Sequence, residues 1–338
     1  MFYNLNIKGD EARMLKEYIE CSFATRQSQE DIICSVSPID VQISIELNEP
    51  WSSVPSKSET FLHHKHLFEV LPSFFKEKIK SGVNHFAQNE FSLANHTRIF
   101  YFQKTSHEFS AYKKIELLVP NHEFKEAIYS LKDYQLENKN DFKKWEVTLN
   151  KDCREVFICT HAERDNCCGK YGLQIFNKFK EENSKLEKGR FRIWKSSHIG
   201  GHRYAPTFFE APSMRWYGLF NIEDVPHFLN RVENNFQIEN NYRGFSGINS
   251  SFVQMAEKEL FKKYSWQWDL AQNKNYEIIL SDDCSNATVL FYFSFPDANG
   301  VVKKIYDIQF EKLITGIASC GSDDSKSVKQ YKIVEIIE

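Results

Sequence analysis

The sequence has no long hydrophobic run. None of its 338 residues belongs to an uninterrupted apolar stretch of about 18, the length that a membrane-spanning helix needs. The first twenty residues, MFYNLNIKGDEARMLKEYIE, are too charged for the apolar core of a signal peptide. We therefore expect a cytoplasmic location and no membrane partner.

An excess of one charge is also missing. The chain has 43 Lys and Arg against 46 Asp and Glu, a net charge of −3. No basic stripe is interleaved with aromatic residues, as a nucleic-acid-binding surface would require. We expect no nucleic-acid partner.

Several short motifs of thiol and metal chemistry are absent. No two cysteines are spaced C-x-x-C, the pattern of thiol–disulfide oxidoreductases, and no Glu follows His198 as in the H-E-x-x-H pattern of zinc proteases. Disulfide frameworks belong to small secreted domains, so the eight cysteines of this chain are expected to be free thiols in a reducing cytosol.

The order of predicted elements indicates an α/β fold that is built twice. In the first half we predict strands at 41–47, 98–103 and 112–119 and a helix at 66–83, which Pro72 kinks or starts. The second half predicts a strand at 154–159, a helix at 169–182, a strand at 191–195 and a strand pair at 207–210 and 215–220. This strand–helix–strand–hairpin order is that of the core of a thioredoxin-like fold, so we expect two such domains in tandem.

The stretch 121–144 is predicted to be a helix that runs into a polar linker, which places the domain boundary near residue 140. We expect residues 1–140 to form a thioredoxin-like domain without a cofactor, because no pair of metal ligands occurs in them. Residues 141–338 should form the second domain together with a β-rich C-terminal extension. The extension is predicted to hold a helix at 250–263, capped by Ser250 or Ser251, and strands at 276–280, 287–295, 301–310 and 330–337.

Cysteines and histidines gather in two segments on either side of the predicted 169–182 helix. CTHAERDNCCG (Cys159 to Gly169) follows one strand, and SSHIGGHRYAP (Ser196 to Pro206) follows the next. The carboxyl ends of neighbouring parallel strands meet at one edge of a sheet, so both segments should surround one point. Thiolates and imidazoles together suit a transition metal or an iron–sulfur cluster.

The glycines between the two histidines argue against a helix. Three residues separate His198 from His202, which could place both rings on one helical face. Gly200 and Gly201 would each cost roughly 1 kcal/mol inside a helix, so a tight loop is expected. Helix amides near Gly169 should favour the thiolate form of Cys168.

These motifs in combination resemble the sucrase/ferredoxin-like family. The resemblance continues through YRGFSG (242–247), Cys320-Gly321 and QYKIV (330–334). The family is similar to thioredoxin-like [2Fe–2S] ferredoxins in which histidines replace the second cysteine pair. It implies an electron carrier rather than an enzyme, with an unidentified redox partner protein. It also implies a [2Fe–2S] cluster with four ligands: Cys159, Cys168, His198 and His202.

We expect the cysteine pair to hold one iron and the histidine pair the other. Two thiolates and two neutral imidazoles make the diferric site formally neutral, so it should be easier to reduce than a four-thiolate site. Proton loss from the imidazoles should make the reduction potential depend on pH. Around the ligands we expect Cys167, Arg164, Gly200, Gly201 and Arg203, with Cys167 able to compete with Cys168.

Two other functions remain open at this point. Two cysteines and two histidines are also a ligand set for zinc, although this cysteine spacing is wider than usual. Thiols on a thioredoxin-like scaffold could alternatively exchange with disulfides. Despite the family's name, no pair of carboxylates supports sugar hydrolysis.

Overall fold

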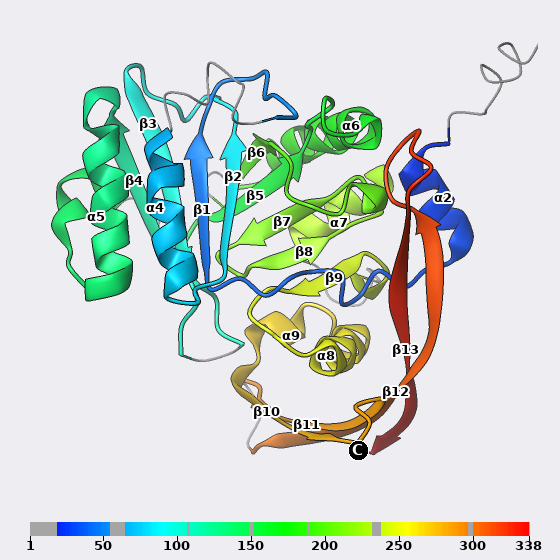
Figure 1. The fold of residues 1–338 in the computed structure, drawn as a ribbon. Coiled ribbons are helices and arrows are strands. Elements are labelled where there is room, and N and C mark those ends of the chain that lie inside the picture. Colours follow the sequence, from blue (N-terminus) through cyan, green and yellow to red (C-terminus); the bar gives the residue numbers. More distant parts are fainter. Residues whose placement is uncertain are drawn as a thin grey trace, which may run out of the picture.

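The structure is a computed structural model that describes residues 19–54, 65–106, 109–148, 152–187, 190–231, 238–296 and 300–337. Within these ranges, no helix has the length and apolar character needed to cross a bilayer. The strands form one mixed sheet in the order β4-β3-β1-β2-β6-β5-β7-β8-β9 and one antiparallel sheet in the order β10-β11-β12-β13 (Figure 1).

The first half of the chain forms a thioredoxin-like unit. Strand β1 is parallel to β2 and antiparallel to β3, and β4 extends the sheet beyond β3. Helices α4 and α5 lie on one side of these strands (Figure 1). The elements are β1 (Val41–Glu46), α4 (Lys65–Lys76), β2 (Ser81–Phe86), β3 (His96–Gln103), β4 (Lys113–Pro120) and α5 (Phe124–Glu137).

The helix predicted at 66–83 was predicted to end too late in the chain. Helix α4 ends at Lys76, with Pro72 inside it, and residues 81–86 form strand β2. The alternation that marks a strand is hidden here because β2 buries polar side chains. Asn84, for example, accepts a hydrogen bond from Ser44 at 2.6 Å and donates one to Ser196 at 2.8 Å.

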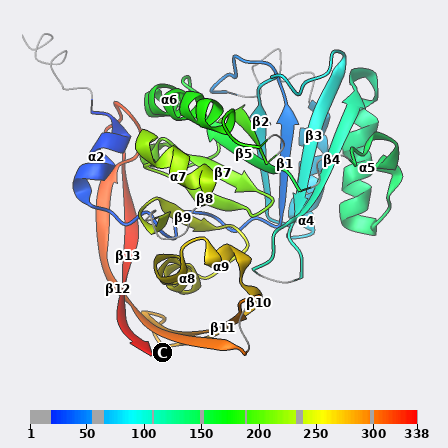
Figure 2. The same cartoon turned by 180° about the vertical axis from the view of Figure 1, so that it is seen from behind.

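The second half repeats the arrangement, as its element order predicted. Strands β5 and β6 are parallel, β7 is antiparallel to β5, and β8 pairs with β7. Helices α6 and α7 lie together over these strands (Figure 2). The elements are β5 (Arg154–Cys159), α6 (Asn166–Asn183), β6 (Phe191–Ser196), β7 (Phe208–Ala211), β8 (Arg215–Tyr217), α7 (Val225–Asn230) and β9 (Tyr242–Phe245).

The two halves join at β2 and β6 and share an aromatic core. Phe86 lies opposite Ser196 in an antiparallel pair, which makes the sheet continuous. Phe100 of β3 packs against Phe157 and Trp194 of the second half, with ring centroids 5.8 Å apart in both contacts. The apolar faces of β1 and β3 instead pack under α4 and α5. The first half therefore supports the sheet from which the Cys and His segments emerge.

Buried ion pairs add to this junction. Arg192 of β6 forms ion pairs with Glu116 of β4 at 2.6 Å and with Glu155 of β5 at 2.5 Å. Lys114 of β4 forms a third ion pair, with Glu155, at 2.6 Å. All these side chains are largely withdrawn from solvent. Removing one partner would leave buried charge uncompensated, so the network depends on both halves being docked.

The C-terminal part contains two further helices and the second sheet. Ser250 caps α8 as predicted, because its hydroxyl accepts a hydrogen bond from the Val253 amide. Strands β12 and β13 are longer than predicted, and their hairpin runs back to α2 near the N-terminus (Figures 1 and 2). The elements of this part are α8 (Ser251–Tyr264), α9 (Gln267–Leu270), β10 (Gln272–Leu280), β11 (Asn286–Ser294), β12 (Val302–Ile317) and β13 (Ser325–Ile337), and α2 is Cys21–Ser28.

Short 3-10 turns complete the described chain. They are Asn121–Glu123, Asp141–Trp145, His202–Tyr204, Ile222–Asp224 and Ile238–Asn240.

Candidate metal centre

The Cys and His segments lie at one edge of the sheet because their strands are parallel neighbours. Cys159, the last residue of β5, is opposite Ser196, the last residue of β6. Cys168 lies in the first turn of α6, which follows β5. The Ala205–Pro206 peptide bond beside them is cis, as in thioredoxin-like folds.

Two glycines let α6 lie directly against the end of β5. A Cβ on Gly172 would be 1.9 Å from the Cys159 carbonyl oxygen, and one on Gly169 would be 2.5 Å from the Ala162 Cβ. No larger residue fits either place without movement of backbone. This close contact sets the separation between the Cys159 and Cys168 thiols.

Three predicted ligands form a compact group. Ligand atoms of Cys159, Cys168 and His198 all lie within 4.8 Å of one another, and both thiols are buried. The neighbouring Cys168 thiol and the nearby His198 ring hold the pKa of Cys159 well below its usual range, and the contact with Cys159 raises the pKa of Cys168. Cys159, and not Cys168 as predicted, is therefore the thiol that ionises more readily, and a metal would displace the second proton.

The two histidines present unsatisfied nitrogens. Their ring centroids are 5.4 Å apart, and the Nδ1 atoms of His198 and His202 are both buried without a hydrogen-bond partner in the described part of the chain. The His202 Nε2 lies 2.8 Å from the Ala318 carbonyl oxygen, which can only accept, so Nε2 carries the proton and Nδ1 a lone pair. Burial lowers the pKa of His202 and keeps the ring neutral. His202 stands outside the compact three-donor group but has the outer hydrogen bond typical of a metal ligand.

The chain between the histidines is a loop, as the glycines predicted. Gly200 and Gly201 have φ of +88° and +75°, in the left-handed region that favours glycine. A Cβ on Gly201 would lie 2.3 Å from a guanidinium nitrogen of Arg243. Arg243 in turn donates to the Gly200 carbonyl at 3.2 Å.

Arg243 is a functional candidate that sequence reasoning missed. Its guanidinium is buried and bonds Ser35 as well as Gly200, and no ion pair of the described residues joins it to a carboxylate. Burial lowers its pKa to about 10, while Cys168 and Cys159 oppose this shift. It is therefore a fixed cation beside the thiols. Arg243 is part of the YRGFSG motif, but no local sequence pattern indicated that its side chain would contact the loop between the two histidines.

His161 was also left out of the predicted site. Its Nε2 lies 2.8 Å from the Trp51 carbonyl oxygen, and its Nδ1 accepts a hydrogen bond from the His198 amide at 3.2 Å. The ring thus orients the start of the histidine loop and is not itself a ligand.

The residues predicted to surround the site do not all lie beside it. Cys167 turns away from Cys168 and lies 3.0 Å from the Cys320 sulfur. Arg203 is paired with Glu30 at 2.6 Å, so its charge is already balanced. Arg164 lines the same pocket as His198, of about 390 Å³.

Cys167 belongs to a second group of donors. Ligand atoms of Cys21, Asp165, Cys167 and Cys320 lie within 4.8 Å of one another. A hydrogen bond from the Cys21 thiol lowers the pKa of Cys167 to about 6 and raises the pKa of Cys21. The adjacent residues Cys167 and Cys168 therefore belong to two different groups of donors.

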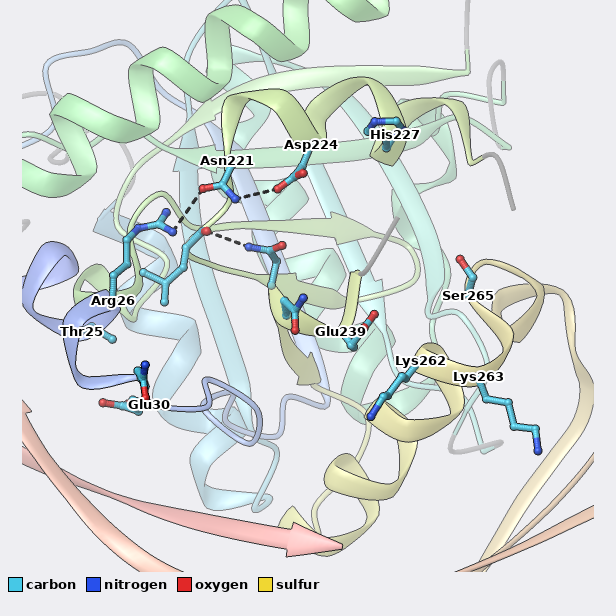
Figure 3. A pocket seen from close by; sticks show the side chains of 14 residues that line it. Thr25, Arg26, Glu30, Asn221, Asp224, His227, Glu239, Lys262, Lys263 and Ser265 are labelled. Carbon is cyan, nitrogen blue, oxygen red and sulfur yellow. Dashed lines mark hydrogen bonds between the residues drawn. The ribbon is translucent and has the colours of Figure 1, made fainter. Parts of the chain in front are cut away.

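A large polar cleft is separate from both donor groups. It has a volume of about 1010 Å³ and polar walls of mixed charge (Figure 3). Among its lining residues, hydrogen bonds link Arg26 to Asn221 and Asn221 to Asp224. None of its lining residues belongs to either group of thiol and imidazole donors.

Comparison with known proteins agrees with the motifs. The sucrase/ferredoxin-like family matches residues 32–244, a range that holds all four predicted ligands. The chain belongs to the sucrase/ferredoxin-like family. Cys21 and Cys320 lie outside the range that the family matches.

Curated relatives match a shorter part. "Altered inheritance of mitochondria protein 32" is 30% identical over 100 residues in Candida glabrata and 36% identical over 86 residues in Debaryomyces hansenii. These matches cover 26% and 24% of this chain and 31% and 29% of the relatives. A solved thioredoxin-like [2Fe–2S] ferredoxin from Aquifex aeolicus aligns with 24% of this chain and 79% of its own, at 19% identity and a TM-score of 0.22.

Proposed function

We propose that this protein is an electron carrier with a [2Fe–2S] cluster held by Cys159, Cys168, His198 and His202. The observation that carries the proposal is the donor set: two buried thiols and two buried imidazole Nδ1 atoms without partners, at one sheet edge. Buried polar atoms in native proteins normally have a partner, so two such atoms together point to a missing metal ligand bond. When bound, the cluster would accept and release one electron.

The surrounding residues suit this role. The Ala318 carbonyl and the Ser319 hydroxyl, at 2.8 and 2.9 Å, hold the outer nitrogen of His202 and fix the ring. Arg243 supplies a buried positive charge beside the thiols, which favours the reduced state.

A single zinc ion is the alternative that one observation favours. Cys159, Cys168 and His198 are as close together as ligands of one ion. Thiol–disulfide exchange is less well supported, because Cys159 and Cys168 are almost completely buried and a protein disulfide could not reach them.

Spectroscopy of the reduced protein distinguishes these possibilities. Purified full-length protein should contain iron and acid-labile sulfide in equal amounts, and after dithionite reduction it should give an electron paramagnetic resonance signal with a lower average g-value than an all-cysteine cluster. His198→Ala and His202→Ala should each lose the signal or shift it. His122→Ala, a histidine whose side chain is 82% exposed, is the matched control. Zinc without iron, even after anaerobic reconstitution, would overturn the proposal.

We further propose a protein redox partner and a cytoplasmic location. The eight cysteines are all free thiols, which suits a reducing compartment. His198 lines a largely apolar pocket with Trp51 and Phe68, and a partner that contacts this pocket would reach the proposed ligand directly. A complex that protects this surface from hydrogen exchange would support the docking position, and protection elsewhere alone would contradict it.

A further inference from the structure

The second group of donors brings together three segments that are far apart in the chain. Cys21 begins α2, Cys167 lies in the first turn of α6, and Cys320 lies in the turn between β12 and β13. The Cys320 sulfur is 3.0 Å from that of Cys167 and 3.4 Å from that of Cys21. Cys21 and Cys167 are buried, and Cys320 is half-buried.

Asp165 completes the group from the N-cap of α6. Its Oδ1 lies 3.6 Å from the Cys21 sulfur and 3.0 Å from the Cys320 sulfur. The same carboxylate accepts hydrogen bonds from the amides of Cys167 and Cys320, at 2.9 and 3.0 Å, which fix its orientation. Three sulfurs and one oxygen therefore face a common centre.

These distances fit one tetrahedral ion. Zinc–sulfur bonds of about 2.3 Å and a zinc–oxygen bond of about 2.1 Å place sulfurs about 3.8 Å apart and sulfur about 3.6 Å from oxygen. The Cys21–Asp165 distance already matches, whereas the two sulfur–sulfur distances and the Cys320–Asp165 distance each need to open by less than about 1 Å. Four protein donors leave no open position, which is the character of a structural zinc site.

The charge of the group also calls for a cation. The Asp165 carboxylate is buried, and within the described ranges no ion pair joins it to a Lys or Arg. Buried charges are normally paired or bound to a metal. A divalent ion held by this carboxylate and by the three thiols, which lose their protons on binding, would meet this need.

We propose that Cys21, Asp165, Cys167 and Cys320 bind a zinc ion, separate from the cluster site. The ion would tie α2 and the β12–β13 turn to the start of α6. That turn also supplies Ala318 and Ser319, which hold His202. The zinc site thus stabilises the part of the fold that positions a ligand of the first site. This inference does not rest on the proposed function.

Metal analysis of single-cysteine variants tests the proposal. Full-length protein purified with zinc in the medium should hold about one zinc per chain in addition to any iron. Cys21→Ser and Cys320→Ser should each lose most of the zinc and still bind iron and sulfide. Cys34→Ser and Cys284→Ser, at cysteines outside both groups, should keep the zinc and serve as controls.

A second measurement uses the wild-type protein, in case a variant fails to fold. X-ray absorption at the zinc edge should show about three sulfur ligands and one oxygen or nitrogen ligand. Absence of zinc after reconstitution under reducing conditions would overturn the proposal, and so would a Cys167–Cys320 disulfide in its place. Zinc that is lost on replacing Cys159 but not Cys21 would mean that the ion occupies the first site. Iron and sulfide, measured on the same samples, report on the electron-carrier proposal independently.

Discussion

Replacing Gly172 by alanine should disturb the candidate metal centre more than it disturbs folding. The new Cβ would lie 1.9 Å from the Cys159 carbonyl oxygen, where real Cβ contacts are essentially never below 3.0 Å. Helix α6 must therefore move away from β5 by at least about 1.1 Å, while metal–ligand distances tolerate only about 0.2 Å. Cys168 moves with the helix and Cys159 stays with the strand.

The cost in stability should be small by comparison. Overpacking lowers the free energy of unfolding by about 1–3 kcal/mol, and alanine in place of glycine inside a helix raises it by about 1 kcal/mol. We expect the apoprotein to lose about 0–2 kcal/mol in the free energy of unfolding, measured by urea denaturation. Iron and sulfide per chain should fall several-fold.

Leu173→Ala is the control for this experiment. Leu173 is the next residue of α6 and is 43% exposed, so its truncation leaves the helix–strand contact intact. It should retain the wild-type iron content. Wild-type iron and an unchanged spectrum in Gly172→Ala would refute the idea that this contact sets the spacing of the thiols.

Three further predictions concern the surrounding fold. Asp269→Asn should cost about 3–5 kcal/mol in urea unfolding, because it removes a buried partner of Arg215 and Arg231 at 2.8 and 2.7 Å. Burial alone would raise the pKa of Asp269, but the two arginines outweigh it and hold that pKa below its usual range, so the stability difference should be constant above pH 5 and shrink as the pH falls below about 4. Ser250→Ala should cost about 1 kcal/mol and Ser250→Gly only a few tenths in the same assay, and equal losses would argue against its capping role. Arg243→Gln should lower the reduction potential in a redox titration while Arg243→Lys changes it less, and an unchanged potential in Arg243→Gln would exclude an electrostatic effect.

Local patterns were sufficient for most of the second half. Strand β5 ends at Cys159 as predicted, and α6 and β6 lie within three residues of their predicted ends. Strands β5 and β6 are short runs rich in large apolar residues, and α6 repeats its buried apolar residues at helical spacing. Strand β2 was missed because buried polar residues such as Asn84 replace the apolar alternation, and their hydrogen bonds come from neighbouring strands.

The site residues that sequence reasoning missed act through distant contacts. His161 is held by the Trp51 carbonyl, 110 positions away, and Arg243 reaches Gly200 from 43 positions away. Neither has a spacing that marks a ligand. Only a structure shows that these side chains meet the histidine loop.

The sequence by itself determined that thiols and imidazoles gather at one edge of a parallel strand pair. That conclusion needs only strand periodicity and the positions of two loops, which are local properties. The family resemblance implied Cys168 rather than Cys167 as a ligand, but only the tertiary structure shows what each of the two thiols contacts, because this depends on what packs against each side of α6. Cys168 meets Cys159 and His198, whereas Cys167 meets two cysteines that are 299 positions apart from each other.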